Sequence, residues 1–404
     1  MKPSVYFPKL LLVMTIFISF VQNLPAQQMA IDSSIYDRLA ELEKQAAYKK
    51  PGEDHFMVVG LATFGFVANK TTKLSNGVGQ ITKTNSMADA DHYEFSPMLL
   101  WRHGRKFLLE FEPSFDGYSL GVNWADISYF AAPGLIIRAG YLVIPFGTYN
   151  KRLAAAWIDK LPTDPAGIAD IPPGSDFGVE VEGGLPMGNM KWNYDISVTN
   201  GVQLLSDGEI QSAGIVDNNK NKTITARLGL LPFSNSSLEI GISGLFGTAG
   251  DDQSAFQGTR SAMYALDLNY VKLFNPVLVN IKSQYNYIHI DRQKYIKPDD
   301  SSSYTFNNTT SSYFAQISVR PTGSHNKLIK NLEAAFRTGN FTTPRNSLWG
   351  QKSNIVEAGI LYWLNWRTVL KFGYQSGKAN STALEDQVTN TKSGSLFLQF
   401  SIQL

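Results

Sequence analysis

Apolar and polar residues alternate one by one along most of the chain from His55 onward. In the clearest tract, at the C-terminal end, the apolar members of the alternation are Leu396, Leu398, Phe400, Ile402 and Leu404. Successive side chains of a β-strand point to opposite faces, so this spacing places all five apolar side chains on one face. The tract predicts a strand that continues to residue 404.

Similar tracts recur throughout the chain and predict about sixteen strands. They lie at 55–67, 94–102, 106–115, 121–130, 135–145, 176–185, 191–200, 222–231, 237–247, 261–272, 277–289, 311–320, 331–341, 353–364, 366–375 and 395–404. An even number of strands is the rule for single-chain bacterial barrels.

The connections between these strands alternate in length. Short turns such as His103-Gly104, Pro133-Gly134 and Asn275-Pro276 alternate with longer polar connections. There are two exceptions: the connection between the third and fourth strands is short where a long one is expected, and that between the twelfth and thirteenth is long where a short one is expected. Outer-membrane barrels have short turns at one end and long loops at the other, whereas a soluble sandwich has no reason to sort its loops. Residues 53–404 are therefore predicted to be all-β, a transmembrane antiparallel barrel of about 16 strands, with a soluble secreted sandwich as the alternative.

The first 26 residues have the order of a secretory signal peptide. Lys2 and Lys9 precede an apolar run at 10–21, and Ala26 offers a small residue at a cleavage site. The run is shorter than the ~20 residues that a membrane-spanning helix needs. We therefore expect residues 1–26 to be a signal peptide and the mature protein to reach the outer membrane of a bacterium.

A short periplasmic helix is expected within residues 27–52, ahead of the barrel. Ile35, Leu39, Leu42 and Ala46 recur at heptad-like spacing, and charged residues lie between them. Two interpretations remain open, because so short a helix is marginal alone. It either packs on the barrel or forms a short coiled coil that joins protomers.

Composition agrees with a membrane barrel. Charged residues make up 17% of the chain, below the usual quarter for soluble proteins, yet mean hydropathy is −0.14, too polar for a helical membrane protein. The formal net charge is +2, and Lys2 and Lys9 supply both of the surplus charges. Without a basic surplus, no nucleic-acid partner is expected.

Residues 126–148, which read DISYFAAPGLIIRAGYLVIPFGT, resemble phosphate-selective porins of the O and P type. Arg138, Gly140, Pro145, Phe146 and Gly147 fit the family's run before the constriction loop. The resemblance implies a homotrimeric, sixteen-stranded porin in outer-membrane lipid. Such a porin allows passive diffusion of small hydrophilic solutes or ions, phosphate or other anions among them. The alternative is a non-conducting binding or structural barrel.

The long connection at 148–175 is the candidate constriction loop. It carries Lys151, Arg152, Asp159 and Lys160, and its apolar segment 153–158 needs shelter from water. We therefore expect the loop to fold into the lumen, where it would line the narrowest part of a pore. The alternative is a loop that lies over the outer surface or against a neighbouring protomer.

Alternation also assigns charged residues to the lumen face. The expected inward basic residues are Arg102, Arg138, Arg227, Lys282, Arg320, Arg337, Arg367 and Lys371. The expected inward acids are Glu110, Glu112, Asp126, Glu180, Glu182, Asp195, Glu239, Asp267, Glu333 and Glu357. The two sets are of similar size, so the sequence does not predict a ladder of basic residues for anions.

Catalytic and metal chemistry receive little support from the sequence. The five histidines are scattered, and cysteine is absent. No enzyme activity and no cofactor are expected. The acidic pairs Asp89/Asp91 and Asp251/Asp252 could hold Ca²⁺, but solvated acidic loops explain them better.

Overall fold

The computed structural model describes residues 54–404, apart from 76–77, 88–92, 170, 216, 218 and 385–387. The expected signal peptide at 1–26 and the expected helix at 27–52 lie outside the described residues, as do Asp89 and Asp91. Within the described part, no helix has the length and apolar content that a membrane span requires.

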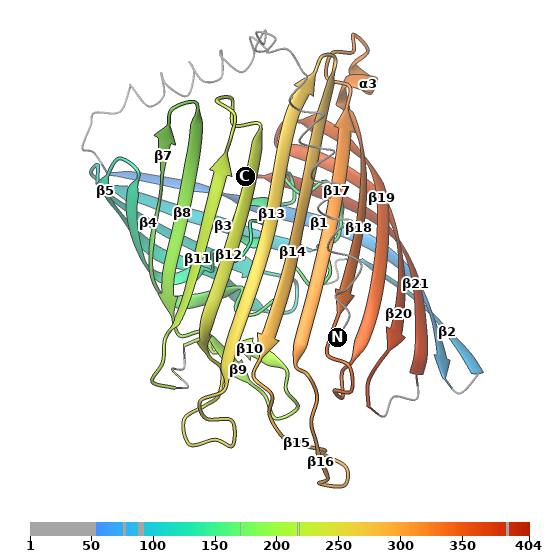
Figure 1. The fold of residues 1–404 in the computed structure, drawn as a ribbon. Coiled ribbons are helices and arrows are strands. Elements are labelled where there is room, and N and C mark those ends of the chain that lie inside the picture. The colour runs from blue at the N-terminus through green and yellow to red at the C-terminus, as the bar shows by residue number, and fades with distance from the viewer. Residues whose placement is uncertain are drawn as a thin grey trace. The chain divides into compact units, whose positions relative to one another are not determined.

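One antiparallel sheet of seventeen strands closes on itself (Figure 1). Its strands are β1 His55–Ser75, β2 Val78–Met87, β3 Glu94–His103, β4 Phe107–Phe115, β5 Leu120–Ala132, β6 Leu135–Val143, β7 Ser175–Met187, β8 Met190–Thr199, β11 Thr223–Leu231, β12 Leu238–Thr248, β13 Arg260–Phe274, β14 Val277–Ile290, β17 Thr309–Arg320, β18 Leu332–Thr342, β19 Gln351–Asn365, β20 Thr368–Ser381 and β21 Val388–Gln403. β3 pairs with the first half of β1, and β2 pairs with its second half. The two strands therefore occupy the same position around the barrel, which is sixteen-stranded.

The barrel closes where the first strand meets the last. β1 pairs with β21 from Leu61↔Gln403 to Ser75↔Val388, so neither strand is left as an open edge. In hydrocarbon every peptide N–H and C=O group needs a partner, and only closure supplies one to both end strands. The sequence-based prediction of a sixteen-stranded antiparallel barrel is confirmed.

The polarity of the two faces of the wall is the reverse of that in a soluble protein, with polar side chains inside and apolar side chains outside. In β11 the polar residues Thr223 and Thr225 are fully buried towards the lumen, whereas Ile224 and Leu228 on the outside are 52% and 47% exposed. Exposed apolar residues continue around the barrel on the neighbouring strands. A surface of this composition is stable against lipid tails and unstable against water.

One expectation about the wall was wrong. Residues 68–93 were expected to connect the first two strands as a long loop, but β1 continues to Ser75 and β2 pairs with it from Phe66↔Met87 to Ser75↔Val78. β2 reads VGQITKTNSM and is mostly polar on both faces, so it shows no regular alternation. Backbone pairing alone makes it a strand.

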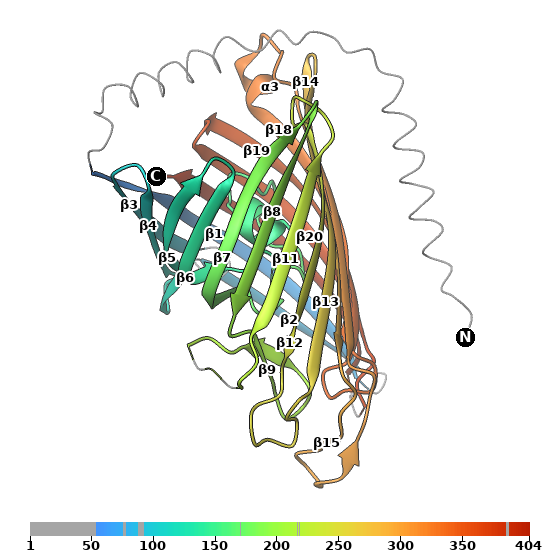
Figure 2. The same cartoon turned by 60° about the vertical axis from the view of Figure 1, so that its left-hand side comes forward.

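The short turns and the long connections lie at opposite ends of the barrel (Figures 1 and 2). The short-turn end also carries the helix α3 Lys327–Asn331, in the connection between β17 and β18. The long-loop end carries two small hairpins, β9–β10 and β15–β16, with strands Val202–Leu204, Ile210–Ser212, Tyr295–Ile296 and Ser303–Tyr304. The β6–β7 connection is different, because it runs inside the barrel (Figure 2).

The outward position of Leu266 yields a test of the lipid-facing wall. Leu266 is 50% exposed on β13, opposite Ile242 of β12. Leu266→Arg should lower the free energy of unfolding from phospholipid vesicles by about 2–4 kcal/mol, because a charge near the bilayer midplane is costly. Urea titration measures the loss. Gln257→Arg, in the exposed β12–β13 loop, is the control. Equal midpoints for the two variants would contradict this placement.

Candidate constriction loop and the ion pairs of the lumen

The β6–β7 connection, residues 144–174, turns inward as soon as it leaves the wall. Gly147 has φ +69°, and a Cβ there would lie 2.1 Å from the Gln284 amide nitrogen, so a side chain does not fit. The Gly147 N–H donates to Ser243 Oγ at 3.0 Å. The Thr148 and Tyr149 N–H groups donate to Gln284 Oε1 at 2.9 and 3.0 Å. These bonds attach the start of the loop to β12 and β14 across the lumen.

Apolar contacts hold the loop in the same place. Ile144 and Phe146 pack among inward residues of β12–β14, including Leu245 and Met263. Further along, Tyr149, Leu153 and Ile168 pack against Phe314 of β17. A π-helical turn, η1 Tyr149–Leu153, forms the first part of the loop and carries Lys151 and Arg152. The apolar residues of the loop are therefore buried from water against apolar patches of an otherwise polar wall.

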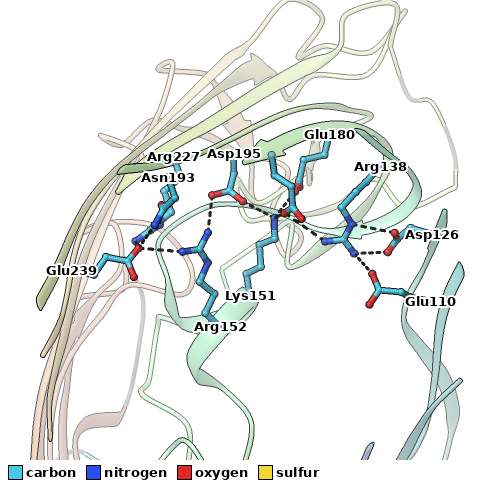
Figure 3. Close-up of polar contacts among 11 residues, drawn as sticks. Glu110, Asp126, Arg138, Lys151, Arg152, Glu180, Asn193, Asp195, Arg227 and Glu239 are labelled. Atoms are coloured by element: carbon cyan, nitrogen blue, oxygen red, sulfur yellow. Dashed lines mark hydrogen bonds and ion pairs between the residues drawn. The ribbon is translucent and has the colours of Figure 1, made fainter. Parts of the chain in front are cut away.

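Lys151 carries the most crowded ion pair of the lumen (Figure 3). Its ammonium contacts Glu180, lies 2.7 Å from Glu182 and lies 2.8 Å from Asp195. The oxygen atoms of these three carboxylates lie within 4.8 Å of one another, a spacing that could hold a metal ion. The ammonium occupies that position in this structure, so Lys151 acts as the counter-ion that neighbouring buried carboxylates require.

The pairing continues along the wall on both sides of Lys151 (Figure 3). Arg152 bridges Asp195 at 3.0 Å and Glu239 at 3.1 Å. The other basic residues also pair with more than one acid: Arg138 lies 2.5 Å from Asp126 and 3.1 Å from Glu110, and Arg227 lies 2.6 Å from Asp267 and 3.0 Å from Glu239. We call this set, from β4 to β13, the proximal cluster; its members are Glu110, Asp126, Arg138, Lys151, Arg152, Glu180, Glu182, Asp195, Arg227, Glu239 and Asp267.

A second set of contacts fixes the far part of the loop. The Arg337 guanidinium lies 3.0 Å from Asp159 and 2.6 Å from Glu357, and also donates to Thr163. The other charged contacts join the loop to β14, β18 and β20. Lys282 donates to the Ile158 carbonyl, Lys371 donates to the Leu161 carbonyl, and Lys160 lies 3.9 Å from Glu333. We call this set the distal cluster; its members are Asp159, Lys160, Asp164, Lys282, Glu333, Arg337, Glu357 and Lys371.

The charge states of the loop residues follow from these contacts. Burial opposes the charged form of Lys151, but the carboxylates around it, that of Glu180 foremost, raise the pKa of its ammonium. Burial likewise opposes ionisation of Asp159, yet Arg337 holds the pKa of that carboxyl below its ordinary value. Burial raises the pKa of the Tyr149 hydroxyl well above its ordinary value, so it remains a donor to the Asp159 carboxylate at 2.7 Å.

Two cavities of about 610 Å³ each border the loop. The first lies between loop residues such as Ala156 and Thr163 and the wall of β1, β2, β20 and β21. The second lies beside Lys151 and Arg152, towards the ends of β4–β8 that carry the short turns, and Gly134 of the β5–β6 turn lines it. Charged and polar side chains line much of both cavities, as a water-filled passage requires.

Most of the candidate residues from the sequence take part in these clusters, and four do not: Arg102, Glu112, Arg320 and Arg367. Glu112 accepts a hydrogen bond from Asn123, and Arg320 donates to the Lys330 carbonyl. Arg102 is exposed at the end of β3, with its guanidinium 5.3 Å from the centre of the Phe130 ring. Arg367 is exposed in the turn between β19 and β20, stacked on Trp366 at 4.4 Å. Alternation does not apply within a turn, so it does not assign Arg367 to the lumen face.

Three contacts of the loop were not foreseen from the sequence. Gln284, Tyr149 and Thr163 hold it in place, but each is an ordinary neutral residue in the sequence. For Gln284 the only signal was its polar character at an inward position. Of the acidic pairs considered for Ca²⁺, the Asp251 carboxylate accepts a hydrogen bond from Gln203 at 2.7 Å.

The fold matches those of solved outer-membrane porins. The outer membrane channel DcaP of Acinetobacter baumannii aligns over 88% of this chain and 99% of that chain, with a TM-score of 0.57 and 12% identity. An anion-selective porin from Comamonas acidovorans aligns over 87% of this chain and 100% of that chain, with a TM-score of 0.53 and 11% identity. No protein-family model matches the chain, and no curated protein sequence matches it. The likeness is one of fold, and the resemblance to the phosphate-selective O and P type stays a prediction from the sequence.

Arg337 provides a test of how the loop is held. Arg337→Met would leave the Asp159 and Glu357 carboxylates buried without their partner, which typically costs about 3–5 kcal/mol. Detachment of the loop relieves this cost, so trypsin should cleave the folded variant after Lys151, Arg152 or Lys160, as mass spectrometry would show. Arg345→Met, at an exposed position in the β18–β19 connection, is the control. Equal resistance of the two variants would show that Arg337 does not hold the loop.

Proposed function

We propose that the protein is a channel of the bacterial outer membrane that lets small hydrophilic solutes or ions diffuse passively. The observation that carries this proposal is a loop anchored across a closed sixteen-stranded barrel, with polar cavities beside it. A barrel of about eight strands fills its interior with side chains, whereas about sixteen strands leave room for an aqueous path. Passive diffusion needs neither a catalytic group nor a cofactor.

The cavities indicate the route. The hydrogen bonds and ion pairs described above attach the loop to β7, β8, β12, β14, β18 and β20, and the Gln399 amide of β21 donates to the Pro162 carbonyl at 3.3 Å. The first cavity continues along β1 and β2, through Thr63, Asn69 and Thr84, and the second borders β4 and β5 through Glu110 and Trp124. We therefore place the conduction path between the loop and the wall formed by β1 and β3–β5.

Location and assembly belong to the same proposal. The inverted wall, with apolar residues outside, supports residence in a lipid bilayer. Cleavage of residues 1–26 and assembly into a homotrimer are expectations from the sequence and from the resemblance stated above. Native mass spectrometry of protein extracted in mild detergent would measure both, through the mass of the subunit and the mass of the complex.

Single-channel recording in a planar bilayer is the direct test. Stable open steps from the refolded protein are expected. A folded, inserted protein that gives no steps would contradict the channel and favour the alternative of a binding or structural barrel. Phosphate as the solute is implied only by the family resemblance.

The absence of cysteine allows a test of the route. Ala156 lines the first cavity, so Ala156→Cys should react with a charged methanethiosulfonate reagent and lose a measurable part of its conductance. Ser303→Cys, exposed on β16 in the outer hairpin, is the control and should keep its conductance. An unblocked Ala156→Cys channel that mass spectrometry shows to be fully modified would exclude this route.

A further inference from the structure

We infer that the lumen selects cations over anions and favours small solutes that carry an ammonium or guanidinium group. This inference rests on the proposed channel function and adds the class of solute. It is opposite in sign to the phosphate preference that the sequence resemblance implies. Four observations, all within the described residues, carry it.

The first observation is the charge balance of the proximal cluster. Its four basic residues, Arg138, Lys151, Arg152 and Arg227, face seven carboxylates, so the cluster has a formal surplus of three negative charges. Each basic group is already bonded to two or three carboxylates. An anion such as phosphate needs basic donors that it can engage directly, and these donors are engaged by the wall.

The second observation is that the distal cluster does not restore the balance. Lys160, Lys282, Arg337 and Lys371 face the four acids Asp159, Asp164, Glu333 and Glu357. Two of the basic groups, Lys282 and Lys371, also donate to backbone carbonyl groups of the loop. The distal cluster is thus formally neutral, and the surplus of the proximal cluster remains uncompensated.

The third observation is the presence of two further acids on strands that border the proposed path. Glu112 of β4 accepts from the neutral Asn123 amide at 2.8 Å, and Glu94 of β3 accepts from the Ser96 hydroxyl. Glu94 lines the first cavity. No ion pair to a basic residue is formed by either carboxyl group among the described residues, so both add to the formal negative charge of the wall. Clefts lined by charges of one sign concentrate counter-ions.

The fourth observation concerns the shape of the carboxylate site. Glu180, Glu182 and Asp195 surround one ammonium, that of Lys151, so their spacing fits a primary amine. Glu180 is fully buried, yet among the described residues its Oε2 has no hydrogen-bond donor. The site therefore retains an acceptor after Lys151 is bound. Beside it, Glu182 and Glu110 are 23% and 20% exposed and within reach of a passing cation.

Two basic residues expected on the lumen face, Arg102 and Arg320, stand against this surplus. Arg102 is exposed at the end of β3, and Arg320, the last residue of β17, donates to the Lys330 carbonyl and lies 5.2 Å from the centre of the Trp363 ring. Charges at the short-turn end are screened by salt over about 10 Å at 0.1 M, whereas charges in a partly buried passage are screened less. The sign of the selectivity is therefore set beside the loop.

The test is the reversal potential of the full-length refolded protein in a planar bilayer under a KCl gradient. The wild-type protein should show the sign of K⁺ preference, and the preference should increase as the mean salt concentration falls. Glu112→Gln keeps the shape of the side chain and its bond to Asn123, and should lower the K⁺/Cl⁻ permeability ratio by about twofold. The control is Asp300→Asn in the exposed β15–β16 hairpin, which should leave the ratio unchanged.

The outcomes separate this inference from the proposed function. Open steps with a reversal potential of the Cl⁻ sign, or an unselective channel, would overturn the inference and leave the channel standing. A folded, inserted protein without open steps would overturn the proposed function itself. An equal change in Glu112→Gln and Asp300→Asn would show that the potential arises at the outer surface and would overturn the assignment to the lumen.

Discussion

The pairing of β1 with β21 is the contact on which the rest of the structure depends. It removes the two edges that a sheet would otherwise expose, and in a bilayer such edges have no water to satisfy them. Closure also encloses a lumen, and because side chains alternate along a strand, each strand then has a lipid-facing side and a lumen-facing side. Polar residues such as Thr223 and Thr225 are buried because they point into this lumen, while Ile224 faces outward.

The enclosed lumen explains both the loop and the charges. Gly147 lets the chain turn inward, Gln284 binds it there, and Lys151 and Arg337 connect it to opposite parts of the wall. Such buried pairs are a weak source of net stability, because desolvation offsets much of the attraction, but breaking one is costly. Their effect is therefore to keep the loop in one position. The same ion pairs engage all four basic residues of the proximal cluster and leave a surplus of carboxylates along the wall.

The strands could be predicted from sequence because period two is a local signal, and all sixteen barrel positions were predicted in this way. The additional strand β2, which shares its position with β3, was missed because apolar and polar residues do not alternate in it. The inward loop was expected from its apolar segment, but its partners were not. Arg337 and Asp159 are 178 residues apart in sequence, and their contact depends on the register of strands and on the path of the loop. Alternation gives a residue's face but not its height, which is why Arg102 lies at a mouth and Arg367 in a turn.

Hydrogen–deuterium exchange in lipid vesicles tests the central claim most directly, that the loop is held within the lumen. The account predicts slow exchange for the amides of Gly147, Thr148 and Tyr149, which donate to Ser243 and Gln284, and fast exchange for exposed turns such as 298–301. Protection of residues 147–149 comparable to that of the barrel strands would support a fixed constriction. Exchange at the rate of a free surface loop would contradict it.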